Sequence, residues 1–136
     1  DLIFASDRVG YERGRDAQGR KRYSLADLYR AADLVTYPSL IEGFGNAFLE
    51  AVYHKKALVM SHYEIYFTDI EPQGFQVIGF DNFIDDRTVR QARNALRDKV
   101  WVAEMAERNY ELGRRHYSYE VLADKLRILV AEAAGR

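Results

Sequence analysis

The sequence has 136 residues, of which 48% are hydrophobic and 30% are charged. This composition fits one globular domain and excludes a disordered chain. The 20 basic and 21 acidic residues leave a net charge of -1, so we expect no general attraction to nucleic acid or to anionic membranes. The lack of cysteine excludes disulfides, thiolate zinc sites and a cysteine nucleophile.

The chain begins at Asp1 without an initiator methionine and continues directly into an apolar run, residues 2–5. This run predicts a short buried strand over residues 2–6, and the abrupt start predicts a piece of a longer protein. No apolar run approaches the roughly 20 residues of a membrane-spanning helix, and a signal peptide is lacking. We therefore expect no transmembrane segment and a cytoplasmic location, which leaves room for peripheral membrane binding by the full-length protein.

A polar stretch from Asp7 to Arg22 contains three glycines and six basic residues, offset by three acidic ones. Glycines and mixed charges without apolar periodicity predict a loop. The charge is compatible with a solvated loop or with an RNA-binding segment, in which only Tyr11 and Tyr23 could stack bases. The scarcity of aromatic residues favours the solvated loop, and we expect no nucleic-acid partner.

The next two elements are a helix and a strand. Ser24 opens the helix, with Asp27 as an approximate capping partner three residues later. Its expected buried face follows helical spacing and consists of Leu25, Leu28, Tyr29 and Ala32. A β-prone run over residues 34–37 ends at Pro38.

A second helix is expected from Asn46 to His54, and buried strands over residues 57–60 and 75–79. Between these strands lies a polar, aromatic loop. From Asp85 onward the apolar spacing predicts only helices. The residues that mark one face of each of these helices are Val89, Ala92 and Leu96, then Val102, Met105, Ala106, Tyr110 and Gly113, then Leu122, Leu126, Leu129, Val130 and Ala133.

Short buried strands that alternate with helices predict an α/β fold, a doubly wound parallel sheet covered on both faces. In such sheets, ligands bind beyond the carboxyl ends of the strands, in the turns that lead into helices. The turn after Tyr37 is therefore the first place to look for function.

This turn contains Gly43 and Gly45, which remove side chains where a ligand could approach the backbone. The N-terminus of the following helix offers free amides and a positive dipole end, which suit a phosphate. Glu42 precedes it and can accept hydrogen bonds from hydroxyl groups. Asn46 and Glu50 share the side of the helix opposite its expected core face, which consists of Phe48, Ala51 and Val52. A sugar nucleotide carries both hydroxyls and phosphates and would fit.

Simpler interpretations of the two glutamates remain open at this point. Ser39 and Glu42 match a capping box, so Glu42 could cap a helix, although Gly43 and Gly45 would weaken the first turns being capped. Glu50 could be a solvated residue that pairs with His54 one turn later. Spacing alone does not decide between these alternatives.

The run DLYRAADLVTYPSLIEGFGNAFLEA, residues 27–51, resembles the donor-binding domain of GT-B glycosyltransferases. It is most similar to the large retaining family of glycogen-synthase-like and mannosyltransferase-like enzymes, the glycosyl transferases group 1. The signature of that family is E-x(7)-E with G-F-G after the first acid, and Glu42 and Glu50 match the two acids. The segment HYSYE, residues 116–120, also matches.

The resemblance implies a role for each residue of the motif. Glu42 would be the catalytic residue that binds hydroxyls of the donor sugar. The residues that would line the sugar pocket through their backbone are Gly43, Phe44 and Gly45. Amides at Asn46 and Ala47 would hold the diphosphate, and Glu50 would bind the ribose. The residues that would lie beside the nucleobase are Arg8, Val9 and Gly10.

The resemblance further implies a metal-independent enzyme without a cofactor, in which the nucleotide sugar is the donor substrate. Residues 1–136 would form a single, N-terminally truncated donor domain, with strands 3–6 of a partial Rossmann-like sheet and a C-terminal helical segment. In the family order 3-2-1-4-5-6, residues 2–6 would be strand 3 without its neighbours. We therefore expect that strand to be frayed, paired differently, or paired with another chain, which would allow self-association.

The chain also departs from the family. It has Lys55 and Lys56 where relatives usually carry Gly-x-Pro, and we expect both lysines to be merely solvated. The strand–helix units that carry a diphosphate-binding Arg and Lys are missing, as is the acceptor-binding domain, so we expect the chain alone to be inactive. An alternative function is a non-catalytic nucleotide-sugar-binding or partner-docking module on the same fold.

Overall fold

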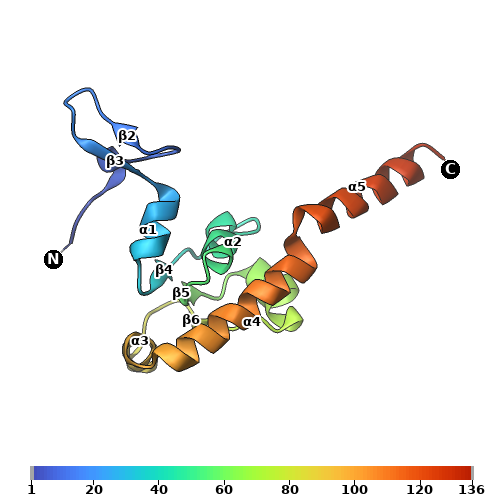
Figure 1. The fold of residues 1–136 in the computed structure, drawn as a ribbon. Coiled ribbons are helices and arrows are strands. Elements are labelled where there is room, and N and C mark those ends of the chain that lie inside the picture. Colours follow the sequence, from blue (N-terminus) through green and yellow to red (C-terminus); the bar gives the residue numbers. More distant parts are fainter. Residues whose placement is uncertain (1, 136) are drawn as a thin grey trace.

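The computed structural model describes residues 2–135. Its centre is a parallel sheet in the order β4 (Val35–Tyr37), β5 (Leu58–Ser61) and β6 (Ile78–Phe80). The chain passes from β4 to β5 through helix α2 (Asn46–Tyr53), and helix α3 (Asp86–Arg97) follows β6 (Figure 1). The expected α/β fold with a Rossmann-like parallel sheet is confirmed.

Both faces of this sheet are covered, because successive residues of a strand point to opposite sides. Leu58 and Met60 of β5 belong to a buried cluster with Phe48 of α2. Val59, between them, belongs to a second cluster with Ala95 of α3. The structure therefore has the two helix layers of a doubly wound sheet.

Helix α3 turns inward a face that only partly matches the one expected. Ala92 is half-buried against the second cluster as expected, and Thr88 and Ala95 are buried, whereas Val89 and Leu96 are exposed. Asp85 caps the helix by accepting a hydrogen bond from the amide of Thr88 at 2.7 Å. The small inward residues let α3 lie close to β6, and this packing overrides the apolar spacing.

The segment between β5 and β6 was expected to be a polar loop, and that expectation is wrong. It contains two short helical turns, η2 (Tyr66–Ile70) and η3 (Glu71–Gln73). Tyr63, Tyr66 and Ile70 are almost fully buried. Phe48 of α2 meets the Tyr66 ring edge-on, with ring centroids 5.9 Å apart. The aromatic side chains therefore form part of the core over α2.

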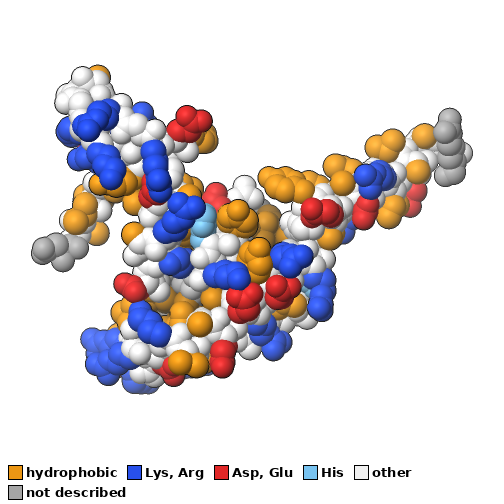
Figure 2. Space-filling view, in the orientation of Figure 1, with side chains coloured by type: hydrophobic (Ala, Val, Ile, Leu, Met, Phe, Trp, Pro, Cys, Tyr) orange, Lys and Arg blue, Asp and Glu red, His pale blue; other side chains and the backbone are white. Residues whose placement is uncertain are grey.

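Two helices follow α3. Helix α4 (Lys99–Tyr117) packs against α2 and buries Asn109. The Asn109 side chain accepts a 2.9 Å hydrogen bond from the N–H of Gln76 and donates a 2.7 Å hydrogen bond to the carbonyl of Gln76. Helix α5 (Tyr119–Ala133) projects away from the body and buries no residue. Its apolar side chains lie on the surface (Figure 2), and they include Leu122, Leu126, Ile128, Leu129 and Val130.

The predicted strand over residues 2–6 is absent. Residues 2–5 form no regular structure, and Leu2, Ile3 and Phe4 are 82–84% exposed. A strand needs a hydrogen-bonded neighbour, and these residues have none within the described part of the chain. Within the described residues this segment is therefore frayed, which is one of the three outcomes expected for it.

The polar stretch that follows is not a plain loop. After a short turn, η1 (Ser6–Arg8), it forms strands β1 (Val9–Gly10), β2 (Gly14–Arg15) and β3 (Lys21–Ser24), in the order β1-β3-β2. We call residues 7–24 the basic arm. It stands apart from the central sheet (Figure 1) and carries clustered basic side chains (Figure 2).

Helix α1 (Leu25–Ala31) connects the basic arm to β4. The predicted capping box at its N-terminus, between Ser24 and Asp27, is confirmed. The expected buried face is only partly correct, because Tyr29 is buried while Leu25 and Leu28 are exposed. These leucines border an apolar hollow of about 240 Å³ beside β4, the outer strand of the described sheet.

The turn after α2 corrects the expectation for the two lysines. The Lys56 Nζ donates a 2.8 Å hydrogen bond to the carbonyl of Ala32, at the C-terminus of α1. The Lys55 Nζ pairs with Glu107 of α4 at 2.6 Å. Lys55 also has a φ of +52°, in the left-handed region that favours glycine. Both lysines therefore contact helices, the end of α1 and α4, and are not merely solvated.

Candidate functional site

The candidate site is built from the loop between β4 and α2. The loop leaves the carboxyl end of β4 after Tyr37, and α2 begins directly after Gly45, whose φ is +88°. Residues 38–45 are not helical, and the Ser39 hydroxyl bonds the carbonyl of Ile41 at 3.3 Å. The capping-box interpretation of Ser39 and Glu42 is therefore wrong.

The N-terminus of α2 is open to a ligand. Helix N-termini leave backbone N–H groups without an intrahelical partner, and no side chain caps α2. Asn46 is exposed and Ala47 half-buried. The amides predicted to hold a diphosphate therefore lie in the first turn of a helix, where the macrodipole favours an anion.

Tyr63 holds the loop around Gly43 and Gly45 in place through a hydrogen bond. Its hydroxyl donates a 2.8 Å hydrogen bond to the carbonyl of Phe44, and its ring is 1% exposed. A Cβ at Gly45 would overlap this hydroxyl, whereas a Cβ at Gly43 would meet no atom within 4 Å. Gly45 is therefore required by the packing, and Gly43 leaves open space beside the loop.

The side chain of Phe44 packs against the C-terminal end of α4. Its ring meets the Tyr117 ring edge-on, with centroids 5.0 Å apart, and Tyr117 in turn stacks on Phe75 at 5.9 Å. The HYSYE segment thus contributes Tyr117 as the anchor of the loop. The ring of Phe44 is therefore half-buried in this aromatic packing.

Glu42 is half-buried next to two hydroxyl groups. Hydrogen bonding to Ser39 and then Tyr37 holds the pKa of the Glu42 carboxyl below its usual range. Burial, followed by the bond to Glu42, raises the pKa of Tyr37. Glu42 is therefore a carboxylate at neutral pH and can accept hydrogen bonds from the hydroxyls of a ligand.

Glu50 lies on the exposed side of α2, as the helical spacing predicts, together with Asn46. Its Oε2 accepts a 3.1 Å hydrogen bond from the hydroxyl of Tyr29 on α1. His54 stacks on the Tyr29 ring, with centroids 4.8 Å apart. No ion pair joins Glu50 to His54 among residues 2–135, so Glu50 is held by Tyr29 instead.

Arg8, Val9 and Gly10 lie in the basic arm, apart from α2 and its loop (Figure 1). The Arg8 guanidinium donates two hydrogen bonds, of 2.8 and 2.9 Å, to the carbonyl of Lys21. Within the described residues no hydrogen bond or ion pair connects these three residues to the β4–α2 loop. The structure brings together the residues from Glu42 to Glu50 and leaves residues 8–10 at a separate place.

Sequence reasoning missed a histidine–aspartate pair at the same edge of the sheet. His62 follows β5, Asp81 follows β6, and the His62 Nδ1 lies 2.9 Å from the Asp81 Oδ1. The pair borders a hollow of about 310 Å³ that extends to the start of α3. Both residues directly follow parallel strands, so the same rule that located the β4–α2 turn could have found them.

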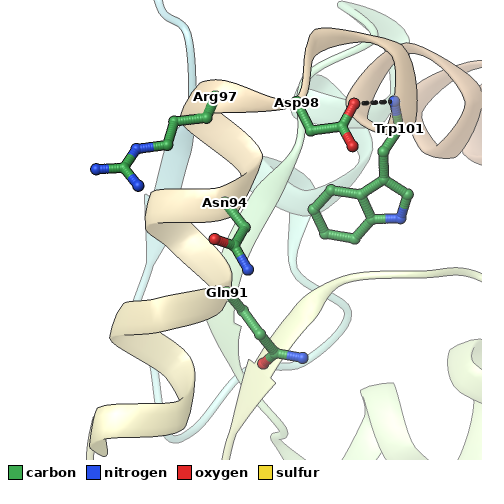
Figure 3. A pocket seen from close by; sticks show the side chains of 5 residues that line it. All are labelled: Gln91, Asn94, Arg97, Asp98 and Trp101. Carbon is green, nitrogen blue, oxygen red and sulfur yellow. Dashed lines mark hydrogen bonds between the residues drawn. The ribbon is translucent and has the colours of Figure 1, made fainter.

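A larger hollow, of about 420 Å³, lies between α3 and α4. Its lining residues come from the end of α3 and the start of α4 (Figure 3) and are Gln91, Asn94, Arg97, Asp98 and Trp101. It shares Gln91 with the hollow beside His62 and Asp81, and none of its lining residues belongs to the β4–α2 turn.

Within residues 2–135, no cluster of three or more His, Asp or Glu side chains is arranged to hold a metal ion. No helix of that part of the chain is both long and apolar enough to cross a bilayer.

Residues 7–98 match the profile of a family described as glycosyl transferases group 1. The mannosylglucosylglycerate synthase of Thermotoga maritima is 39% identical over 121 residues, which cover 79% of this chain and 28% of the relative. The mannosylglucosylglycerate synthase of Petrotoga mobilis is 52% identical over 56 residues, 41% of this chain and 13% of the relative. The chain thus spans less than a third of these curated relatives. No solved structure matches it significantly.

Proposed function

Since the chain belongs to the glycosyl transferases group 1 family, we propose that it forms the donor-binding part of a retaining glycosyltransferase. Such an enzyme moves a sugar from a nucleotide sugar to an acceptor. The observation that carries the proposal is the β4–α2 turn, where two accessible carboxylates, Glu42 and Glu50, flank an uncapped helix N-terminus.

Each part of the turn suits one part of a nucleotide sugar. Glu42 would accept hydrogen bonds from hydroxyls of the sugar, beside the open backbone at Gly43. The amides of Asn46 and Ala47 would bind the diphosphate, and Glu50 would bind the ribose. Catalysis would rest on positioning and on stabilising the departing diphosphate, without a metal ion held by this chain.

The relatives also suggest a product. Both proteins are named for the synthesis of mannosylglucosylglycerate. By analogy, we propose mannose as the transferred group and an acceptor that carries a glucosylglycerate unit.

The role of Glu42 can be tested by Glu42→Gln in the full-length protein, with a nucleotide-sugar panel as donors and sugar transfer as the readout. Loss of a charged hydrogen-bond acceptor is worth about 1.5–3 kcal/mol, so we expect kcat/KM to fall about 10- to 100-fold. The control is Glu64→Gln, because Glu64 is exposed and lies outside the β4–α2 turn. If the chain is a docking module, neither substitution should have an effect. Equal sugar-transfer activity of the two variants would refute the proposal.

A further inference from the structure

We propose that Tyr29 is a positioning residue that orients Glu50 toward the ribose of the donor nucleotide. The inference rests on the proposed function and extends it to a residue of α1. Its central observation is the 3.1 Å hydrogen bond from the Tyr29 hydroxyl to the Glu50 Oε2.

This hydrogen bond restricts a side chain that would otherwise be mobile. Glu50 is exposed, and a free glutamate loses rotamer entropy when it binds a ligand. With Oε2 held by Tyr29, the carboxylate has a fixed orientation. Its Oε1 receives no hydrogen bond within residues 2–135 and can accept one from a ligand hydroxyl. The entropic cost of ordering Glu50 is thus met before the nucleotide binds.

Tyr29 is rigid enough to serve as a support. Its side chain is 9% exposed, and His54 lies flat against the ring at 4.8 Å and 14°. Helix α1 is fastened at both ends, by the Ser24–Asp27 capping box and by the bond from Lys56 to the Ala32 carbonyl. The hydroxyl therefore holds a defined position relative to α2.

The Tyr29 hydroxyl also keeps its proton. Burial, together with the Glu50 carboxylate, raises the pKa of Tyr29 to about 12. At neutral pH it is therefore a constant donor to Glu50. A carboxylate oriented in this way should distinguish a ribonucleotide from its deoxy counterpart, because only the former offers the full set of ribose hydroxyls.

The experiment compares UDP, GDP and ADP with their 2′-deoxy and 3′-deoxy counterparts, with Kd measured by calorimetry on the full-length protein. Tyr29→Phe keeps the ring and its stacking and removes only the hydroxyl. We expect it to reduce the ribose-to-deoxyribose affinity ratio about 3- to 10-fold, and to raise KM for the donor sugar while kcat stays nearly constant. The matched control is Tyr53→Phe. Tyr53 lies on α2, the helix of Glu50, is 70% exposed and meets the His54 ring edge-on.

Glu50→Gln separates the two proposals. If Glu50→Gln lowers the affinity ratio and Tyr29→Phe does not, the positioning role is refuted and the ribose role of Glu50 stands. If neither substitution changes the ratio, or if no nucleotide binds, the proposed function of this site fails and the inference fails with it. Equal effects of Tyr29→Phe and Tyr53→Phe would also refute positioning, since they would indicate a general packing effect.

Discussion

Gly45 is the residue at which the fold and the candidate site constrain each other most closely. It lies in the left-handed region, with a φ of +88°, and starts α2. An alanine there would pay a backbone penalty of about 1–2 kcal/mol, and its Cβ would overlap the hydroxyl of the buried Tyr63. We expect Gly45→Ala to lower the free energy of unfolding by about 2–4 kcal/mol, measured by urea denaturation.

The neighbouring glycine supplies the control for this prediction. Gly43 has no atom within 4 Å of an added Cβ and does not have a positive φ. Gly43→Ala should therefore change stability by less than about 0.5 kcal/mol. If both substitutions destabilise the chain equally, the constraint that we assign to Tyr63 is wrong.

At the scale of elements, α1 is the link between the basic arm and the site. Asp27 caps α1 and also pairs with Arg13 of the arm. The Arg13 hydrogen bond, and after it the amide of Ser24, hold the pKa of Asp27 well below its usual range. Because the pKa is lower in the folded state, the ionised carboxylate stabilises the fold above the unfolded pKa of about 3.9. That contribution is lost as the pH falls further.

This linkage gives a prediction for Asp27→Asn. The variant should melt below the wild type at pH 7, and the difference in Tm should shrink steadily as the pH is lowered from about 4. Circular dichroism at a series of pH values would measure it. Asp124→Asn is the control, since Asp124 is an exposed residue of α5 with one neighbouring Arg127. A Tm difference for Asp27→Asn that is the same at every pH would contradict the role of its charge.

The elements also show how far a sequence can be interpreted. The central strands and α2 were predictable because short apolar runs bounded by Pro38 and by glycines fit only buried strands and their turns. The strands of the basic arm were not predictable, because β3 has the sequence Lys21-Arg22-Tyr23-Ser24 and lacks alternating apolar residues. Its strands arise from pairing on both sides of β3. Backbone pairing of that kind leaves no periodic signal in the side chains.

In the candidate site too, some residues could be predicted from the sequence and others could not. Glu42, Asn46 and Glu50 could be found from their spacing, because one turn and one helix position them all. The support by Tyr29 could not, since the hydrogen bond spans 21 residues and depends on how α1 packs against α2. Tyr63 was also missed, because aromatic residues among polar ones were interpreted as a loop rather than as core.

At the scale of the whole molecule, the chain presents large apolar surfaces to solvent. They lie on residues 2–4, on α5, and in the hollow where Leu25 and Leu28 border β4. Beside that hollow, β4 has no partner strand on its outer side within the described residues. An unpaired strand next to exposed apolar side chains is a template for association. The exposed edge that could drive self-association is therefore β4, rather than the predicted strand over residues 2–6.

This edge can be blocked without removing a hydrogen bond between the strands of the described sheet. The amide of Val35 donates to the carbonyl of Ala57 in the neighbouring chain segment at 3.0 Å. Because adjacent residues of a strand direct their amides to opposite sides, the amide of Thr36 points to the open side. Thr36→Pro removes only that outward donor, and proline is tolerated on an edge strand.

We expect the 136-residue chain to form larger species as its concentration rises and Thr36→Pro to remain monomeric, measured by light scattering after size-exclusion chromatography. Leu126→Lys, on the exposed face of α5, should leave the association intact. If Leu126→Lys abolishes association and Thr36→Pro does not, the contact runs through α5, and the role assigned to the β4 edge is wrong.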